Sequence, residues 1–454
     1  MSDVPISSAT AARSAPRMTV SLGWIEKALV VGAFLIFLGA FKTVLLSGGD
    51  DRTAGSALFQ LVSSSIYLAS MVIVVARGFP PWGFTILRRA WPLLLLTALT
   101  LASVLWSQDP GPTLRRSIAL ILCTWFAFYI VLRFNPRSFI DLLVIAFGVL
   151  LVVSVLAAAI PGQGITSGGA YEGAWRGLTG NKNELGRVIG LAVALLPAAA
   201  VIGLTNRPRS ALLIGVAAIP VLLLSRSATS LMAAVLGVGL GGVVYVLFGG
   251  RIGRIRLRAE LRVTLGVIAV VSGLALFTVA WTPLLLALGR DPTLTGRTKL
   301  WDWALSMNQD RQLLGSGYRS FWIDKNTRYF FLAFAWNKDG EGERSDSFSG
   351  PTHAHSGYVD LILELGYVGL SVFIVTVLSG LVNLHRVVRR GNLQLGFIFA
   401  VILAFLLVYA ITARSILQQA EGLWVLFAVF YLYSIKESLF LEGEVKRSVV
   451  RAGA

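Results

Sequence analysis

The amino-acid sequence predicts an all-α, polytopic membrane protein. Hydrophobic residues fill 56% of its 454 positions and charged residues only 14%, and the mean hydropathy is +0.74. A soluble domain of this length could not bury so much apolar surface. Apolar runs of about 20 residues, the length that an α-helix needs to cross a bilayer core, recur along the chain. Together these observations predict about 12 transmembrane helices.

The first apolar run begins near Trp24 and is long enough to span a bilayer, so we expect a retained helix and not a cleavable signal peptide. The residues before it, rich in Ser, Ala, Pro and Arg, are expected to be a disordered tail. The twelve runs lie near residues 24–46, 56–76, 91–106, 117–133, 139–160, 186–204, 210–225, 229–248, 263–287, 357–381, 393–413 and 416–435.

These runs divide the chain into five expected parts. A cytoplasmic tail is followed by nine spans, a long periplasmic loop, three further spans and a second cytoplasmic tail. Their expected bounds are 1–22, 23–287, 288–356, 357–437 and 438–454.

The distribution of basic residues predicts the orientation. A net charge of +17 would suggest a nucleic-acid partner in a soluble protein, but in a membrane protein Lys and Arg accumulate in cytoplasmic loops. Both termini are therefore expected in the cytoplasm, and no nucleic acid is expected as a partner. The cytoplasmic residues would be Arg77, Arg88, Arg89, Arg133, Arg137, Arg207, Arg209, Arg251, Arg254, Arg256, Arg258, Arg262, Arg386, Arg389, Arg390, Lys436, Lys446, Arg447 and Arg451.

A second group of basic residues falls on the opposite, periplasmic side, where the positive-inside bias does not account for it. Guanidinium groups bind phosphate through paired hydrogen bonds, so this group predicts recognition of an anion, phosphate above all. Alternatively, these side chains contact lipid headgroups or pair with acids such as Asp109 and Glu184, and both interpretations stay open. The group comprises Arg115, Arg116, Arg176, Lys182, Arg226, Arg297, Lys299 and Arg414.

The long periplasmic loop contains one predicted helix. After Gly296-Arg297-Thr298, apolar residues recur at helical spacing, which predicts an amphipathic helix in the membrane interface with Arg297 at its N-terminal end. Gly315 and Gly317 then predict a turn. Alternatively, the loop is a structured cap on the periplasmic side and takes no part in a reaction. The apolar residues of the helix are Leu300, Trp303, Ala304 and Met307.

Two of the three histidines, His353 and His355, lie where this loop meets the next apolar run. Imidazole is the side chain best suited to accept a proton near neutral pH. The chain has a single cysteine, Cys123, so a disulfide framework is excluded. It has no Asp-x-Asp, Walker or His-Glu-x-x-His motif, so a nucleotide-driven pump and a zinc protease are unsupported. Outward arginines could neutralise a diphosphate leaving group without a metal, so a transferase with a lipid-diphosphate donor is one hypothesis.

A secondary transporter is the alternative class. Transporters place ionisable residues or broken helices near the bilayer midplane. The expected spans are nearly free of charge, and Glu364, one turn after Asp360, is the main exception. This pattern weighs only weakly against ion-coupled transport.

The histidine segment resembles the signature of the O-antigen ligase and Wzy-type polymerase family. His355-Ser356, then nine residues, then Gly366-Tyr367-Val368-Gly369 is similar to the family's His, then Asn, Ser or Gln, nine residues and Gly-x-x-Gly. Leu370 departs from the fuller ligase pattern, which has Gly, Thr or Tyr there. Other patches resemble the family in order: Trp175-Arg176-Gly177 with Asn181-Lys182-Asn183, Ser225-Arg226-Ser227, and Gly296-Arg297-Thr298-Lys299-Leu300-Trp301.

One further patch is similar to the exopolysaccharide-polymerase members of this family. It consists of Trp106-Ser107-Gln108-Asp109-Pro110 with Thr113-Leu114-Arg115-Arg116-Ser117. The resemblance implies a metal-independent, inverting glycosyltransferase of the bacterial inner membrane that needs no cofactor and uses an undecaprenyl-diphosphate-linked oligosaccharide at the periplasmic face. We expect polymerisation of exopolysaccharide repeat units first, ligation of O-antigen to the lipid A core as the alternative, and polysaccharide transport third. The expected partners also include a glycan acceptor, membrane lipids and a chain-length regulator.

The resemblance also implies roles for single residues. Arg226 and Arg297 would hold the diphosphate, and Arg176 and Lys182 would line the same cavity. His355 would activate the acceptor hydroxyl.

Four further positions complete these expectations. His353 would assist or replace His355, or would be an orienting or surface histidine, and both readings stay open. Gly366 and Gly369 would let the helix pack closely beside the site, a structural role. His385, beside a cytoplasmic arginine, is expected to take no part.

Overall fold

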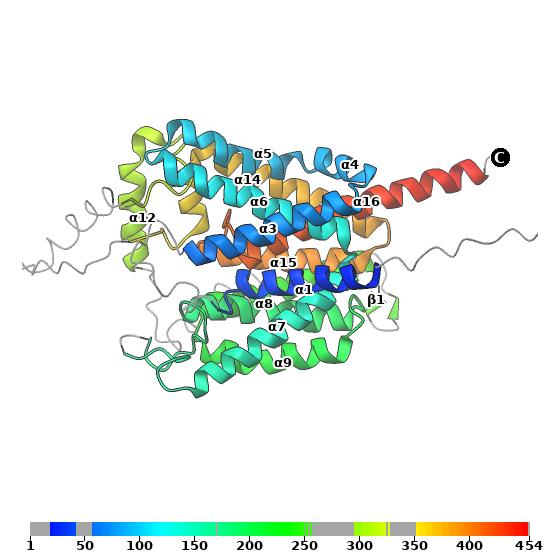
Figure 1. Cartoon of the computed structure of the whole chain (residues 1–454), viewed down its shortest axis with the longest axis horizontal. Helices are drawn as coiled ribbons and strands as arrows, with labels where there is room; N and C mark the ends of the chain where they lie inside the picture. Colours follow the sequence, from blue (N-terminus) through cyan, green and yellow to red (C-terminus); the bar gives the residue numbers. More distant parts are fainter. Residues whose placement is uncertain are drawn as a thin grey trace, which may run out of the picture.

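The protein is a bundle of α-helices that run roughly along one common direction, as the computed structural model in Figure 1 shows. The structure describes residues 19–41, 57–168, 171–249, 251–252, 255–256, 295–323, 326 and 351–452. The all-α membrane fold that the sequence predicted is confirmed within these residues.

The helices follow one another along the chain with mostly short connections. Among the described residues, one pair of two-residue antiparallel strands follows α10. In order they are α1 (Thr19–Phe37), α3 (Ala57–Arg77), α4 (Pro81–Arg89), α5 (Trp91–Ala102), η1 (Ser103–Trp106), α6 (Pro110–Arg133), α7 (Pro136–Ala159), α8 (Lys182–Val201), α9 (Pro208–Leu224), α10 (Ala228–Gly249), β1 (Arg251–Ile252), β2 (Ile255–Arg256), α12 (Thr295–Met307), η3 (Gln309–Arg311), α14 (Gly357–Arg389), α15 (Leu393–Thr412) and α16 (Gly422–Ala452).

Local sequence explains where many of these helices begin. Proline is the first residue of α4, α6, α7 and α9, a position that needs no N–H donor and suits its fixed φ angle. Asparagine caps α7 as well as α8 and α15: the side chains of Asn135, Asn181 and Asn392 accept hydrogen bonds from the first backbone N–H groups of these helices. These caps satisfy donors that a helix leaves open.

Eight of the described helices are long and apolar enough to cross a membrane, and a ninth span results if α4 and α5 with η1, bent by 73°, are counted as one. Helix α9 is apolar but shorter. The predicted count of twelve is not confirmed. Eleven of the twelve predicted runs coincide with a described helix, and the run at 263–287 lies outside the described residues.

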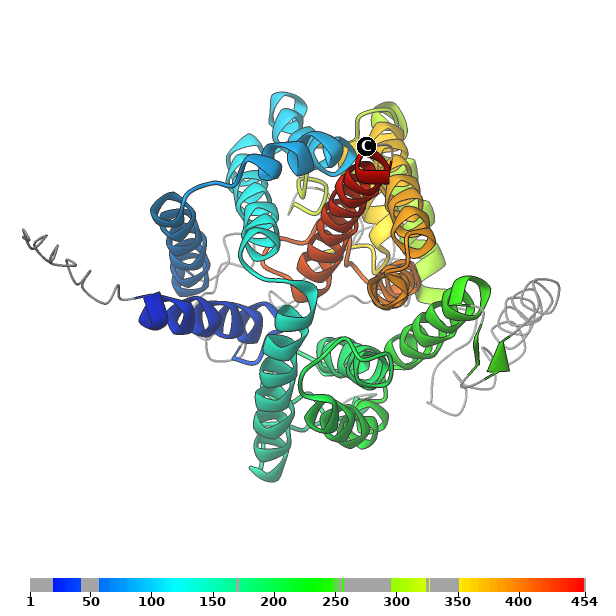
Figure 2. The same ribbon diagram turned by 90° about the vertical axis from the view of Figure 1, so that its right-hand side faces the viewer.

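The core lies around α15 and α16. Helix α15 contains no charged residue and packs against α8, α10, α14 and α16. Seen end-on in Figure 2, α16 lies in the middle of the bundle. Large aromatic side chains fill its surroundings, and Trp424, Tyr431 and Tyr433 are fully buried. Dense packing of this kind is what holds membrane helices together where lipid provides no hydrophobic force.

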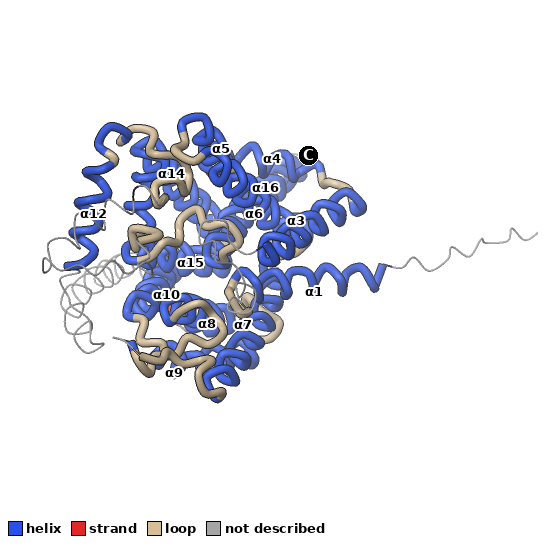
Figure 3. The backbone as a smooth tube through the Cα atoms, turned by 60° about the vertical axis from the view of Figure 1, so that its left-hand side comes forward, coloured by secondary structure: helices blue, strands red, loops and turns tan. Residues whose placement is uncertain are grey.

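The two ends of the bundle differ. Helix α12 lies across one end, and α4 and the C-terminal part of α16 lie at the other, so we name these the α12 end and the α4 end (Figure 1). Irregular segments gather at the α12 end, which is turned forward in Figure 3. Helix α3 ends at Arg77 and α6 at Arg133, and both side chains bind the buried Glu26 of α1. The assignment of the α4 end to the cytoplasm stays a prediction.

Helix α12 agrees with the helix that was predicted in the long loop. It begins at Thr295, so Arg297 lies in its first turn. Leu300 and Ala304 are buried as expected, whereas Met307, predicted on the same face, is 45% exposed. The Trp301 indole N–H donates to the Ala354 carbonyl oxygen across 2.7 Å and so fixes α12 to the histidine segment.

Candidate active site

A cavity of about 1040 Å³ opens at the α12 end, between the helices. One part of its wall carries apolar side chains of α1, α3 and α6, among them Phe37, Phe59 and Ile118, and α6 also contributes the cationic Arg115 and Arg116. The remaining wall is polar and cationic. It comes from the start of α8, the first turn of α12 and the loops that precede α14 and α16. Such a combination can accommodate an apolar chain next to an anionic group.

Both candidate histidines line this cavity, and their ring centroids lie 4.1 Å apart. Ala354 between them is fully buried, and its backbone is fixed on both sides. Its N–H donates to the Asp360 carboxylate across 2.9 Å, and its carbonyl oxygen accepts from Trp301. His355 has a φ of +54°, a left-handed conformation that is uncommon for a residue with a side chain. The chain therefore turns sharply here and presents both imidazoles to the cavity.

The surroundings keep both histidines neutral near pH 7. Loss of hydration in the cavity wall, followed by the positive charges of Arg414, Arg319 and Arg297, lowers the pKa of His353 to about 4. For His355 the same loss of hydration, followed by His353 and Arg297, lowers the pKa to about 4. A neutral imidazole has a free lone pair, so each can accept a proton from a hydroxyl group.

Two of the four predicted diphosphate-binding residues line the cavity. Arg297 lies in the first turn of α12, and one of its N–H groups donates to the Thr412 carbonyl oxygen across 3.2 Å. Lys182, the first residue of α8, is only 5% exposed, and its ammonium group lies 3.4 Å from the centre of the Tyr171 ring. The structure thus brings both cations to the same cavity as the histidines.

The other two predicted residues, Arg176 and Arg226, are not among the described residues that line this cavity. The Arg176 guanidinium donates to the Gly162 carbonyl oxygen across 3.2 Å. Arg226 is exposed, and its guanidinium donates to the Glu172 carbonyl oxygen across 3.1 Å. Their diphosphate-binding role stays a prediction.

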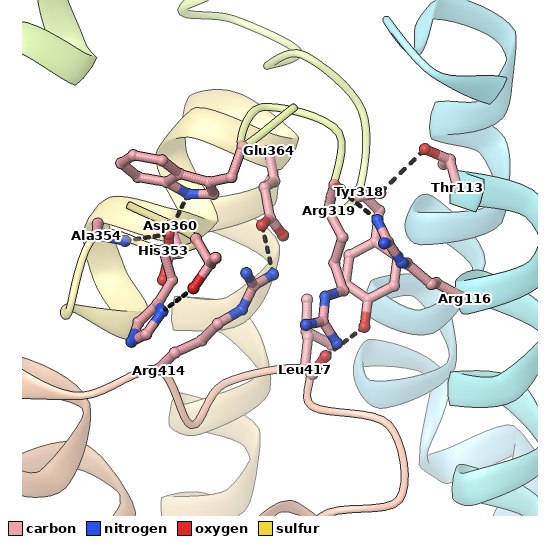
Figure 4. Close-up of polar contacts among 12 residues, drawn as sticks. Thr113, Arg116, Tyr318, Arg319, His353, Ala354, Asp360, Glu364, Arg414 and Leu417 are labelled. Atoms are coloured by element: carbon pink, nitrogen blue, oxygen red, sulfur yellow. Dashed lines mark hydrogen bonds and ion pairs between the residues drawn. The ribbon is translucent and has the colours of Figure 1, made fainter. Parts of the chain in front are cut away.

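Arg414 had been recognised only as one of several outward basic residues, and the structure gives it a defined place. Its guanidinium lines the cavity and donates to the Glu364 carboxylate across 2.5 Å (Figure 4). Glu364 was noted in the sequence as the main charge within an apolar span. A buried carboxylate requires a partner, and this was the signal that could have predicted the pair.

Two further arginines were not identified from the sequence. Arg319 lines the cavity, and its guanidinium donates to the Gln419 side chain across 2.8 Å. Arg187 of α8 also lines it and forms an ion pair with Glu421 across 3.0 Å. Their roles depend on contacts between segments about 100 and more than 200 residues apart along the chain, which no local pattern reveals.

Left-handed backbone conformations gather around the same cavity. His355, Arg319 and Ala420 line it with φ angles of +54°, +56° and +51°. Leu417, with a φ of +54°, accepts a hydrogen bond from the Tyr318 hydroxyl. Residues held in such conformations persist only where surrounding contacts fix them, and they concentrate at functional sites.

The two glycines of the Gly-x-x-Gly signature differ in their surroundings. Gly366 has a φ of +65° and a ψ of −166°, which interrupts the helical geometry of α14. A Cβ atom at this position would come within 2.2 Å of the Leu313 carbonyl oxygen, whereas one at Gly369 would approach the Leu365 side chain of the same helix. The close approach at Gly366 is therefore to a loop, and only glycine permits it.

Comparisons with known proteins agree with the motifs. The family described as O-antigen ligase matches residues 192–374, which include Arg297, both histidines and both glycines. The "Exopolysaccharide production protein ExoQ" of Rhizobium meliloti (strain 1021) is 25% identical over 285 residues. This match covers 61% of the present chain and 61% of that relative, so it spans less than two thirds of the relative's length. Residues 192–374 are therefore similar to the O-antigen ligase family, in agreement with the motifs, and an exopolysaccharide production protein is among the relatives of the chain.

Proposed function

We propose that the protein is a membrane glycosyltransferase that joins exopolysaccharide repeat units carried on a lipid diphosphate. The observation that carries this proposal is the meeting of two neutral histidines with several cationic side chains in one cavity that also has an apolar wall. The family match and the exopolysaccharide relative support the same class of reaction.

The proposed reaction assigns one role to each part of the cavity. His355, assisted by His353, takes the proton from an acceptor hydroxyl as the hydroxyl oxygen bonds to the anomeric carbon of the donor sugar. The bond from that carbon to the diphosphate oxygen breaks, and the diphosphate leaves with the electron pair. Attack opposite the leaving group inverts the configuration at the anomeric carbon. Arg297 and Lys182 stabilise the negative charge that develops on the leaving group.

The protonation states suit this assignment. A base must be unprotonated at the working pH, and the lowered pKa of both histidines provides this condition. Arginine stays protonated in proteins, so Arg297 can hold a diphosphate without a metal ion. The apolar residues contributed by α1, α3 and α6 would accept the first isoprene units of an undecaprenyl carrier.

Ligation of O-antigen to the lipid A core is the second candidate, and the family description favours it. The two functions differ in what accumulates when the gene is deleted from the source bacterium. Loss of a polymerase leaves single repeat units on the lipid carrier, whereas loss of a ligase leaves long polymer on the carrier. We expect single repeat units. Accumulation of carrier-linked polymer would favour the ligase, and an unchanged pool of lipid-linked intermediates would contradict both.

A reconstituted reaction tests the chemistry. Purified protein in liposomes should extend a lipid-linked repeat unit in the presence of a chelator, and proton NMR of the product should show an inverted anomeric linkage. Activity that is lost in chelator and restored by a divalent cation would contradict the metal-independent scheme.

A further inference from the structure

A loop is inserted into the hydrogen-bond ladder of α14. In a continuous helix, the N–H groups of Tyr367 and Val368 would donate to the carbonyl oxygens of Leu363 and Glu364. Here they donate to two carbonyl oxygens of the preceding loop, those of Gln312 and Leu313, across 2.9 and 3.1 Å. The two carbonyl oxygens that this releases accept the N–H groups of Ser316 and Gly317, both across 2.9 Å. Four loop-to-helix bonds thus replace two bonds of the helix. We call residues 312–320 the inserted loop.

Three glycines permit this arrangement. A Cβ atom at Gly366 would lie 2.2 Å from the Leu313 carbonyl oxygen, and one at Gly315 would lie 2.4 Å from the Glu364 carbonyl carbon. Gly317 would likewise collide with Ser107, at 2.6 Å. Gly315, Gly317 and Gly366 also have positive φ angles. Glycine satisfies both requirements at once, because it has no Cβ and readily adopts positive φ.

The other side of the inserted loop is bound to the helices around α6. The Tyr318 N–H donates to the Ser103 hydroxyl across 2.9 Å, and the Tyr318 carbonyl oxygen accepts from Thr113 across 3.1 Å. The Arg116 guanidinium donates to the Arg319 carbonyl oxygen across 2.7 Å. Figure 4 shows the contacts of Thr113 and Arg116 beside Arg319. The backbone of residue 319 is therefore held from two directions, by α14 and by α6.

The result is a pair of guanidinium groups in the cavity wall. Arg319 is held by the inserted loop, and Arg414 is held by Glu364, the residue whose carbonyl oxygen also accepts from Gly317. Burial, followed by the charge of Arg414, lowers the pKa of Arg319 to about 10. Both positive charges also act on His353. The Glu364 carboxylate supplies one negative charge beside them, and the Arg116 guanidinium, which also lines the cavity, supplies a third positive charge. The group therefore keeps a net positive charge in a partly dry site, and this favours the binding of an anion.

We propose that the inserted loop and the break at Gly366 position Arg319 and Arg414 as an anion-binding subsite beside His353, and that this subsite takes a phosphate group of a lipid diphosphate. The identity of this ligand rests on the proposed function. Each guanidinium has five N–H donors in a rigid fork that matches phosphate oxygens. Within the proposal, Arg319 and Arg414 are binding residues, and Gly366 is a positioning residue that acts through Arg319.

Binding of inorganic pyrophosphate to the purified full-length protein tests the subsite without requiring turnover. Calorimetry at fixed ionic strength would compare the wild-type protein with Arg319→Ala, Arg319→Lys and Arg311→Ala. Loss of a charge-assisted hydrogen bond should weaken binding by about 10-fold or more in Arg319→Ala. Lysine should restore part of the affinity, because it keeps the charge and lacks the fork. Arg311, the last residue of η3, directly precedes the inserted loop, is exposed and does not line the cavity, so its removal should leave the affinity unchanged.

Gly366→Ala tests the positioning role, with Gly242→Ala as the matched control because a Cβ there meets nothing within 4 Å. The Gly366 variant should elute as a folded protein and bind pyrophosphate about as weakly as Arg319→Ala. If it does not fold, Tyr318→Phe takes its place. That variant removes the hydroxyl that donates to Leu417 and keeps the ring, and should weaken binding by roughly 2- to 10-fold.

The outcomes separate this inference from the proposed function. Wild-type protein that does not bind pyrophosphate, or Arg319→Ala that binds it equally well, would overturn the subsite. Wild-type affinity in a folded Gly366→Ala, or in Tyr318→Phe, would overturn the positioning by the inserted loop. A protein that binds through Arg319 but joins no sugar units would remove the proposed function and leave the subsite standing.

Discussion

The Arg414 guanidinium donates to the Glu364 carboxylate across 2.5 Å, with side chains that are only 10% and 5% exposed. The pair joins the loop between α15 and α16 to the first turns of α14. Removal of one partner from such a pair leaves an uncompensated buried charge. This lowers the free energy of unfolding far more than replacement of both partners does. The pair therefore offers a direct way to separate stability from function.

Glu364→Gln should destabilise the protein by about 3 kcal/mol or more, because Arg414 would keep its charge without a partner. Thermal unfolding of the purified protein in detergent measures this. Glu364→Gln combined with Arg414→Gln should regain much of that stability, because the buried charge is gone. The double variant should nevertheless remain inactive, since it lacks a proposed phosphate-binding side chain. A single variant that is as stable as the wild-type protein would show that the pair contributes nothing to the fold.

The pH dependence of transfer should report the lowered pKa of the histidines. An ordinary histidine would gain a proton as the pH falls through about 6.5 and would then no longer be a base. With pKa values of about 4, His353 and His355 stay neutral at pH 5 and become protonated only near pH 4. The transfer rate should therefore change little between about pH 7 and 5 and fall below that. A rate that halves near pH 6.5 in a protein that remains folded would contradict this assignment.

The same pKa values have a consequence for stability. Since the folded-state pKa lies below the unfolded-state value, the unfolded chain binds more protons between about pH 6.5 and 4. Stability should therefore decrease as the pH falls through this window. Replacement of both histidines by Gln should remove this part of the pH dependence, which unfolding measurements at pH 7 and pH 5 would reveal.

Arg297 and Arg226 should differ in their importance. Both were predicted to hold the diphosphate, but only Arg297 lines the cavity in the structure. Arg297→Ala should lower the transfer rate by roughly 10- to 100-fold, and Lys should restore it only in part, because lysine offers a point charge instead of a fork. Arg226→Ala should have a smaller effect. Equal losses in the two variants, measured with the same lipid-linked donor, would show that Arg226 reaches the substrate.

Cysteine labelling tests the orientation. The native Cys123 is buried, so it should give little background. Leu313 is 66% exposed at the α12 end, and a cysteine there should react with a membrane-impermeant reagent added from the periplasm. A cysteine at the exposed Ser210, near the start of α9, should react only after the membrane is opened. The reverse pattern would place the cavity on the cytoplasmic side.

The membrane fold could be predicted from the sequence because helix length and apolarity are local properties. The histidine segment was also predictable, because His353 and His355 are rare polar residues at the edge of an apolar run. Arg297 was found because the positive-inside bias could not explain it, and α12 places it where the spacing indicated. Lys182 was found in the same way.

The inserted loop could not be predicted. Its bonds to α14 are made by backbone N–H and carbonyl groups, which every residue has, so they leave no trace in composition. Gly366 was interpreted as a residue for close helix packing, because small size and a positive φ angle both require glycine and the sequence does not distinguish them. Arg319 gains its position through contacts between distant segments: its own with Arg116 and Gln419, and that of the neighbouring Tyr318 carbonyl oxygen with Thr113.

The most direct test of the account is sugar transfer by the His355→Ala variant in liposomes that contain a lipid-linked repeat unit. His385→Ala, on the histidine that was expected to take no part, is the matched control. We expect the His355 variant to bind the donor and to form no polymer, while the control polymerises at the wild-type rate. Wild-type polymer formation by His355→Ala, and equally by the variant that lacks both His353 and His355, would contradict the assignment of the base and with it the proposed mechanism.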